Sequence, residues 1–192
     1  MDNISCIKRK IKEIIDKSSV PEDPVHSKDT LEWLLNLEPD ADDALQIAAF
    51  GHDIERAIEE RKVKRKDYKN YDDFRQAHSL NSAKILSELM EECNIDRELL
   101  NDVNYLLCNH ETGGNRRSDI LKNADSVSFF HVNLPYYFER HSVDETKKRC
   151  LWGYGKLPDN LKEIVAEFSY ENKELESLFR CLIKKSSLQC QR

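Results

Sequence analysis

Apolar residues recur along this chain with the spacing of amphipathic helices. In the first segment, isoleucines at positions 4, 7, 11, 14 and 15 fall on one helix face among charged residues. The same spacing predicts helices over residues 24–37, 41–59, 71–93 and 97–110, and a further one after residue 118. No stretch alternates apolar and polar residues for long enough to indicate a strand. The pattern therefore predicts an all-α fold, built as a helical bundle.

Proline, glycine and Asx residues mark the expected helix ends. Pro24 suits the first turn of the second helix, and Asp40 is expected to cap the third. The pair Gly113-Gly114 predicts a tight connection, after which Ser118 or Asp119 is expected to cap a helix.

The segment after Pro135 has a weaker pattern. Helices are expected there over residues 144–152, 160–168 and 171–185, with a turn at 153–155. At 192 residues the chain fits a single helical domain spanning 1–192. Its core is expected over about 25–130 and a C-terminal helical extension over about 144–186.

Composition narrows the class of protein. The chain is 39% hydrophobic and 34% charged, with only 5 Gly and 5 Pro, which favours long helices over a turn-rich β fold. Its net charge of -6 does not favour nucleic acid or an anionic membrane as a partner. No segment approaches the roughly 20 apolar residues that span a bilayer. The six cysteines contain no CxxC pair, so we expect free thiols in a reducing, cytoplasmic location.

Histidines and aspartates on apolar helix faces carry the chemistry. They lie mostly four, seven, eight or eleven residues from apolar positions of their own helices, so they are expected to point inward. Burying one unpaired polar group costs about 1–3 kcal/mol, and five successive helices carry such a position. Divalent metal ions, one or two per chain, supply the missing partner, and mixed His/carboxylate sets suit Fe, Mn, Co, Zn or Mg. The six candidate metal ligands are His26, His52, Asp53, His78, His110 and Asp125.

This ordered set resembles the HD superfamily of metal-dependent phosphohydrolases, and within it the subset with two added histidines and a two-metal centre. The similarity covers about residues 25–130, and the chain is also similar to uncharacterised HD-like bacterial proteins. The matching stretches are Gly51-His52-Asp53-Ile54-Glu55-Arg56, Ala77-His78-Ser79, Asn109-His110-Glu111-Thr112-Gly113-Gly114 and Asn123-Ala124-Asp125-Ser126. The resemblance implies an HD-like helical core with additional C-terminal helices.

The resemblance also implies how the ligands are shared between two metals. The first metal would be held by His26, His52, Asp53 and Asp125. The second would be held by His78, His110 and Asp53, which bridges. Two metals about 3.5–4 Å apart can bind a phosphoryl group, activate water and stabilise the leaving oxygen.

Other residues are candidates for catalysis and for contacts with phosphate. Arg56 occupies a position where many family members carry a phosphate-contacting lysine, although a surface arginine is an equal interpretation. Glu55 is a candidate catalytic acid, a partner for a histidine N–H, or a solvent-facing residue. Lys28 and Arg117 are expected to contact phosphate because they lie near ligand positions in the sequence. The basic residues 61–66 either draw polyanions toward the site or form a solvated face.

These observations predict a metal-dependent phosphohydrolase that cleaves a phosphate ester or anhydride of a small nucleotide or phosphorylated metabolite. Asp53 bridges the metals in this interpretation, and the partner is a small phosphorylated substrate. Two alternatives remain open. One is a di-iron oxygenase with the same ligands, and the other is a metal- or nucleotide-binding module without turnover.

Overall fold

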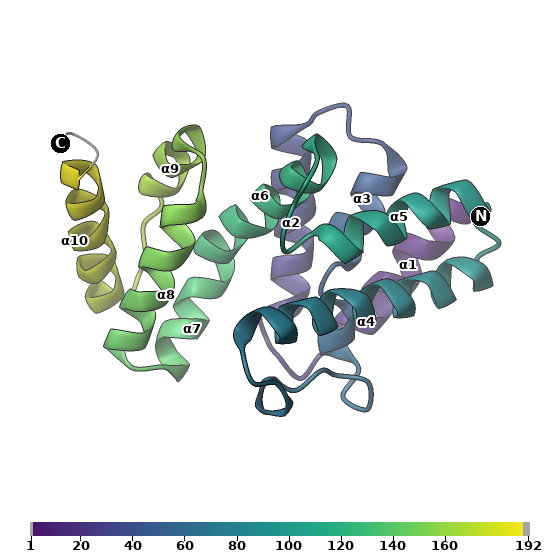
Figure 1. The fold of residues 1–192 in the computed structure, drawn as a ribbon, viewed down its shortest axis with the longest axis horizontal. Coiled ribbons are helices and arrows are strands. Elements are labelled where there is room, and N and C mark those ends of the chain that lie inside the picture. The colour runs from purple at the N-terminus through teal and green to yellow at the C-terminus, as the bar shows by residue number, and fades with distance from the viewer. Residues whose placement is uncertain (1, 190–192) are drawn as a thin grey trace. The chain divides into compact units, whose positions relative to one another are not determined.

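The computed structural model describes residues 2–189, which form helices joined by short connections, with no strand in that range (Figure 1). The all-α prediction is confirmed. The chain divides into two compact units, one ending at Asp125 and one beginning at Ser126. This division lies inside a helix.

The first unit contains all the candidate metal ligands. Its elements are α1 (Asn3–Ile15), α2 (Asp23–Leu37), α3 (Asp43–Gly51), the 3₁₀ helices η1 (Ile54–Ala57) and η2 (Arg65–Asp67), α4 (Tyr71–Glu92), α5 (Arg97–Asn109) and most of α6 (Arg116–Ser128). Helix α4 packs along α5, and α3 packs against both α2 and α5. Ile7, Ile11 and Ile15 of α1 are buried in this core, as their spacing predicts. Fully burying each such side chain stabilises the fold by about 1.5–3 kcal/mol.

Two helix ends differ from the sequence predictions. The third helix ends at Gly51 rather than near residue 59, and Asp42, not Asp40, caps its start by accepting the Leu45 N–H at 2.9 Å. Its end coincides with His52, whose side chain bonds a carbonyl of the last turn. A methyl group at Gly51 would lie 3.1 Å from Leu86, so glycine permits close packing there.

The connection before α6 is the tight turn that its glycines predict. Gly113 and Gly114 both have positive φ, at 73° and 129°. Helix α6 is capped by Asn115, whose side-chain oxygen accepts the Ser118 N–H at 2.9 Å. The cap therefore lies earlier than predicted, because the helix begins directly after the glycine turn.

A disulfide joins Cys6 of α1 to Cys93 at the end of α4. The prediction that all cysteines are free thiols is therefore wrong for this pair, although Cys108, Cys150 and Cys181 are free. Sequence spacing alone did not show that the two chain segments meet. Cys190 lies outside the described residues. None of the described helices combines the length and hydropathy needed to cross a membrane.

The second unit is built from η3 (Phe129–Asn133), α7 (Leu134–Arg140), α8 (Val143–Lys156), α9 (Asp159–Ala166) and α10 (Lys173–Gln189). Residues 153–155 continue α8 instead of forming the predicted turn. Gly153 leaves space for Phe130, whose ring would lie 3.2 Å from an added Cβ. His131 packs against the Phe168 ring, and His141 stacks on Tyr137 at 3.8 Å.

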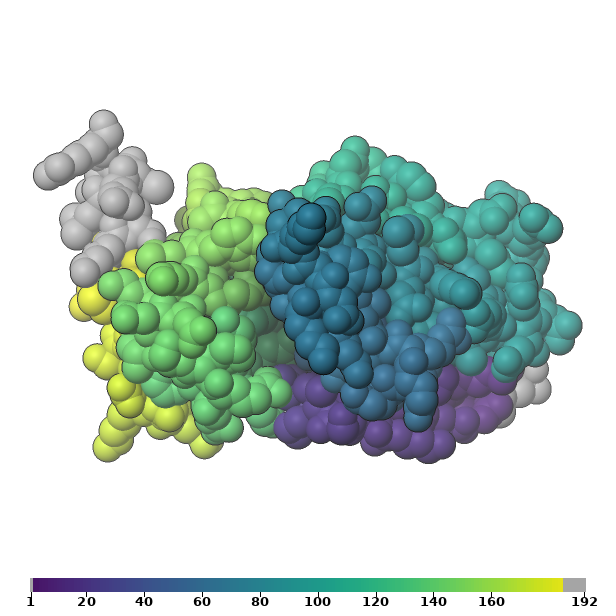
Figure 2. Space-filling view, turned by 60° about the horizontal axis from the view of Figure 1, so that its bottom comes forward, coloured from purple at the N-terminus to yellow at the C-terminus, as the bar shows by residue number. Residues whose placement is uncertain are grey.

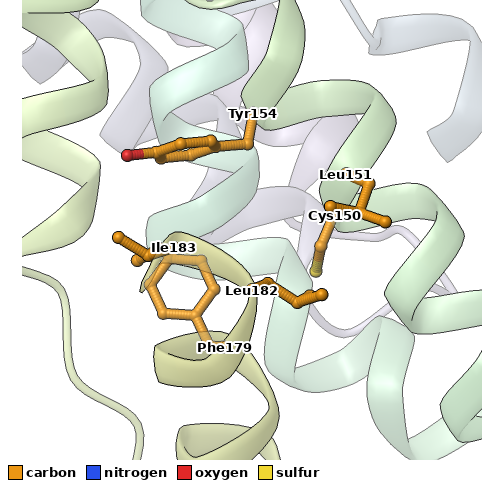
Figure 3. Close-up of a pocket in the computed structure, with 6 residues that line it drawn as sticks. All are labelled: Cys150, Leu151, Tyr154, Phe179, Leu182 and Ile183. Carbon is orange, nitrogen blue, oxygen red and sulfur yellow. The ribbon is translucent and has the colours of Figure 1, made fainter. Parts of the chain in front are cut away.

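A small apolar pocket lies between α8 and α10 in this unit (Figure 3). It has room for no more than about one water molecule. Its lining residues are Cys150, Leu151, Tyr154, Phe179, Leu182 and Ile183.

Candidate metal centre

The first unit brings the six candidate ligands together in two groups of three. In each group the ligand atoms lie within 4.8 Å of one another, so each group can hold a metal ion. The first group, metal group 1, consists of His26, His52 and Asp125. The second, metal group 2, consists of Asp53, His78 and His110.

Three of these residues project from within helices. His26 lies in α2, His78 in α4 and Asp125 in α6. Both histidines are at least 95% buried, whereas the Asp125 side chain is 23% exposed. Metal group 1 is therefore open to solvent on the side of Asp125.

Two further histidines lie immediately after helices. His52 follows α3 and donates from Nδ1 to the Ala49 carbonyl at 2.9 Å, and His110 follows α5 and donates to the Leu107 carbonyl at 2.7 Å. Carbonyls in the last turn of a helix lack the usual backbone N–H from four residues later, so these bonds also help to satisfy the helix ends. With the proton held on Nδ1, each Nε2 keeps a lone pair for a metal.

A buried carboxylate fixes the orientation of the fourth histidine. His78 donates from Nδ1 to Glu55 Oε1 at 2.7 Å, and its Nε2 lies 2.8 Å from Asp53 Oδ1. The second oxygen of Glu55 accepts the Val63 N–H at 2.6 Å and approaches the Asn81 amide at 3.3 Å. In the structure Glu55 is therefore a partner for a histidine N–H, one of the roles expected for it, and both of its oxygens accept hydrogen bonds.

The carboxylate of Asp53 lies between the two metal groups. Its Oδ1 contacts His78, while its Oδ2 lies 3.7 Å from His52 Nε2 and 3.8 Å from His26 Nε2. A carboxylate that faces two ligand groups with different oxygens has the geometry of a bridging ligand.

Two imidazoles approach each other closely in metal group 1. His26 Nε2 lies 3.2 Å from His52 Nε2 and 3.1 Å from Asp125 Oδ1. Because the Nδ1 of His52 donates to a carbonyl, its Nε2 presents a lone pair to the neighbouring ring. A shared cation between these atoms, either a proton or a metal, relieves the contact. The donor atoms of both groups therefore fit divalent metal ions.

The pKa values in the two groups show strong coupling between the histidines and the carboxylates. Burial by itself lowers the pKa of a histidine, but the nearby carboxylates outweigh it and raise the pKa of His52 to about 9 and that of His78 to about 10. Burial opposes ionisation of Asp53 and Asp125, yet the adjacent histidines keep both pKa values below the usual range. Burial lowers the pKa of His110.

Arg56 is the cation beside the metal groups. Its Nη1 donates to Asp53 Oδ2 at 2.7 Å, and its Nη2 lies 3.0 Å from Asp23 Oδ1. Ser18 in turn donates to the other oxygen of Asp23 at 2.6 Å. The Arg56 side chain is 28% exposed, so it is partly accessible to solvent. Asp23 was missed in the sequence, although it lies one helical turn before His26.

Lys28 and Arg117 are not at the metal groups, contrary to the expectation that they contact phosphate. Lys28 points to solvent, with a side chain that is 75% exposed and 3.3 Å from Glu32. Arg117 donates to both oxygens of Asp102 and of Asp42. Lys28 lies on a helix position that faces away from His26, and Arg117 lies about two turns of α6 before Asp125.

A second arginine fixes the chain beside metal group 2. Arg75 donates to the Glu111 side chain at 2.6 and 2.8 Å and to the Glu111 carbonyl, next to His110. Arg75 and Asn81 lie three residues before and after His78, so all three share a face of α4. That spacing was the signal from which both could have been found.

Comparison with known proteins gives a family. No curated protein and no solved structure matches the chain. The family model described as a domain of unknown function, DUF4202, matches residues 8–179. This span includes all six residues of the two metal groups. The chain therefore belongs to the DUF4202 family.

Proposed function

We propose that this protein is a metal-dependent phosphohydrolase that acts on a phosphate ester or anhydride of a small nucleotide or phosphorylated metabolite. The observation that carries the proposal is the position of Asp53 between two adjacent His/Asp groups. The order of the ligands along the chain, which resembles that of the two-metal HD phosphohydrolases, supports the same assignment.

The chain's own residues supply orientation and charge. Two divalent ions held by these residues would polarise phosphoryl oxygens and lower the pKa of a bound water. Asp53 holds the two ligand groups at a common carboxylate, and Glu55 keeps the His78 Nε2 lone pair directed at metal group 2. Arg56, which is partly exposed and pairs with Asp53, would neutralise a phosphate oxygen.

Two measurements test the proposal. The first is elemental analysis of the purified protein, for which we expect up to two divalent metals per chain. The second is phosphate release from a panel of nucleotides and phospho-sugars with Mn²⁺, Co²⁺, Fe²⁺ or Mg²⁺. We expect release that is lost in Asp53→Asn and retained in Asp40→Asn, which removes the same charge from an exposed loop.

The alternatives predict different results. Two irons per chain, a redox-active spectrum and oxygen consumption without phosphate release would assign the site to a di-iron oxygenase. Bound metal with neither phosphate release nor oxygen consumption would indicate a binding module. Either outcome overturns the hydrolase proposal.

A further inference from the structure

The loop between η1 and α4 concentrates positive charge beside metal group 2. We call residues 58–70 the basic strap. The strap includes six lysines and arginines and three acidic residues, although the whole chain has a net charge of -6. The strap lies in the blue part of the surface in Figure 2 and is the loop that precedes α4 in Figure 1.

Some of this charge is already neutralised within the protein. Arg61 donates to both oxygens of Glu88, and Lys62 lies 3.8 Å from Glu59. The three other lysines of the strap are exposed, and no ion pair to them occurs within residues 2–189. These unpaired lysines are Lys64, Lys66 and Lys69.

The strap is bonded to the carboxylate that orients a metal-group histidine. The Val63 N–H donates to Glu55 Oε2 at 2.6 Å, while Glu55 Oε1 accepts from His78 Nδ1 at 2.7 Å. The Asn81 amide also donates to the Arg61 carbonyl at 2.6 Å. One carboxylate therefore separates the strap backbone from an imidazole of metal group 2.

Aromatic packing attaches the strap to the same histidine from another direction. The Tyr68 ring lies 6.1 Å from the Phe74 ring, which stacks on His78 with centroids 6.5 Å apart. Together with the Glu55 bonds, this contact fixes the strap at the edge of metal group 2. The exposed lysines thus extend from a segment that is anchored beside the site.

We propose that the basic strap binds the phosphates that do not react, and that the substrate is therefore a short phosphate chain with at least two groups. This inference rests on the proposed phosphohydrolase function. A single phosphate is already matched by two metal groups and Arg56, which leaves the strap lysines without a ligand. A chain of phosphates supplies further anionic oxygens, and the flexible four-carbon lysine stems can follow them. The overall negative charge favours a small polyanion over a long nucleic acid.

Binding measurements on the full chain separate these possibilities. The probes are inorganic tripolyphosphate, inorganic phosphate and a single-stranded oligonucleotide, each titrated calorimetrically with and without Mn²⁺. We expect tripolyphosphate to bind more tightly than phosphate, with an affinity that falls as salt rises. The triple variant Lys64→Gln, Lys66→Gln, Lys69→Gln should weaken tripolyphosphate binding about tenfold, since exposed charge pairs contribute little individually.

A control variant has the same change in net charge. Lys17→Gln, Lys147→Gln, Lys148→Gln removes three exposed lysines outside the strap and should leave tripolyphosphate binding unchanged. Equal losses in both variants, or no loss in the strap variant, would overturn the inference. Strap-dependent binding of the oligonucleotide that matches or exceeds that of tripolyphosphate would overturn it as well.

The outcome also separates this inference from the hydrolase proposal. If the strap binds tripolyphosphate but no substrate releases phosphate, the hydrolase proposal fails and the anion site stands. If monophosphate esters are hydrolysed while the strap variant binds tripolyphosphate normally, the hydrolase stands and the strap inference fails.

Discussion

Replacing Glu55 by Gln tests whether the carboxylate behind His78 determines metal binding. Glutamine has the same shape but only one acceptor oxygen, whereas Glu55 accepts from His78 with one oxygen and from the Val63 N–H with the other. If the amide nitrogen faces His78, it donates to Nδ1 and forces the proton onto Nε2, the atom that metal group 2 requires. If it faces Val63 instead, two buried donors meet, at a cost of about 1–3 kcal/mol.

Either arrangement removes the carboxylate that pairs with His78, so both should weaken metal binding at metal group 2. Removing the carboxylate partner of a metal-bound histidine weakens metal binding by about 10–100-fold, or about 1.4–2.8 kcal/mol. The assay is a titration of metal-stripped protein with Mn²⁺ or Zn²⁺ against a chelating dye, fitted to two sites. One site should weaken by this factor, while the site of metal group 1 keeps its affinity.

The control for this experiment is Glu88→Gln, which removes an exposed carboxylate that pairs with Arg61 of the strap. It carries the same charge change and contacts the same loop, but it does not contact His78. Both variants should keep the far-UV circular dichroism of the parent. If both metal sites of the Glu55→Gln variant bind metal with affinities within about twofold of those of the parent, the role assigned to Glu55 is wrong.

Three further predictions follow from the site. Asp53→Asn should weaken metal binding at both metal groups, whereas Asp125→Asn should weaken it only at metal group 1. If the two variants retain the same number of metal ions per chain after dialysis, the bridging position of Asp53 is contradicted. In EDTA-treated protein, the raised pKa values of His52 (about 9) and His78 (about 10) stabilise the fold below about pH 6.5, and this contribution is lost as pH rises through 9–10. Bound metal replaces those protons, so the stabilisation caused by metal should grow over the same pH range. Urea unfolding at several pH values, with and without metal, measures both trends. Parallel plots of unfolding free energy against pH for the two forms would refute them. Asp23→Asn removes the second carboxylate at the guanidinium of the site and should destabilise the fold by about 1–3 kcal/mol; an unchanged urea midpoint would show that the pair contributes nothing.

The helices could be predicted from the sequence because their apolar spacing is regular. The buried isoleucines of α1 show this well. The end of α3 could not, because it depends on a bond from His52 to a carbonyl that periodicity does not reveal. Likewise the two glycines at 153–155 indicated a turn, but the close approach of Phe130 accounts for Gly153 within a helix.

Candidate ligands were predictable for the same reason, since polar residues on apolar helix faces point into a core. Residues chosen only by nearness in sequence were not at the site. Lys28 follows His26 by two positions, about 200° around the helix, and Arg117 precedes Asp125 by eight, about 12 Å along the axis. The carboxylate that pairs with Arg56, Asp23, depends on a tertiary contact and became visible only in the fold.

The disulfide between Cys6 and Cys93 encloses two members of each metal group in one covalent ring of chain. The third member, Asp125 in one group and His110 in the other, comes from chain beyond the ring. A metal ion bound in either group would therefore act as a second cross-link, which joins the later helices to the loop closed by the disulfide. Oxidation and metal uptake would thus restrain complementary stretches of the same unit, and the loss of either would leave the other restraint in place.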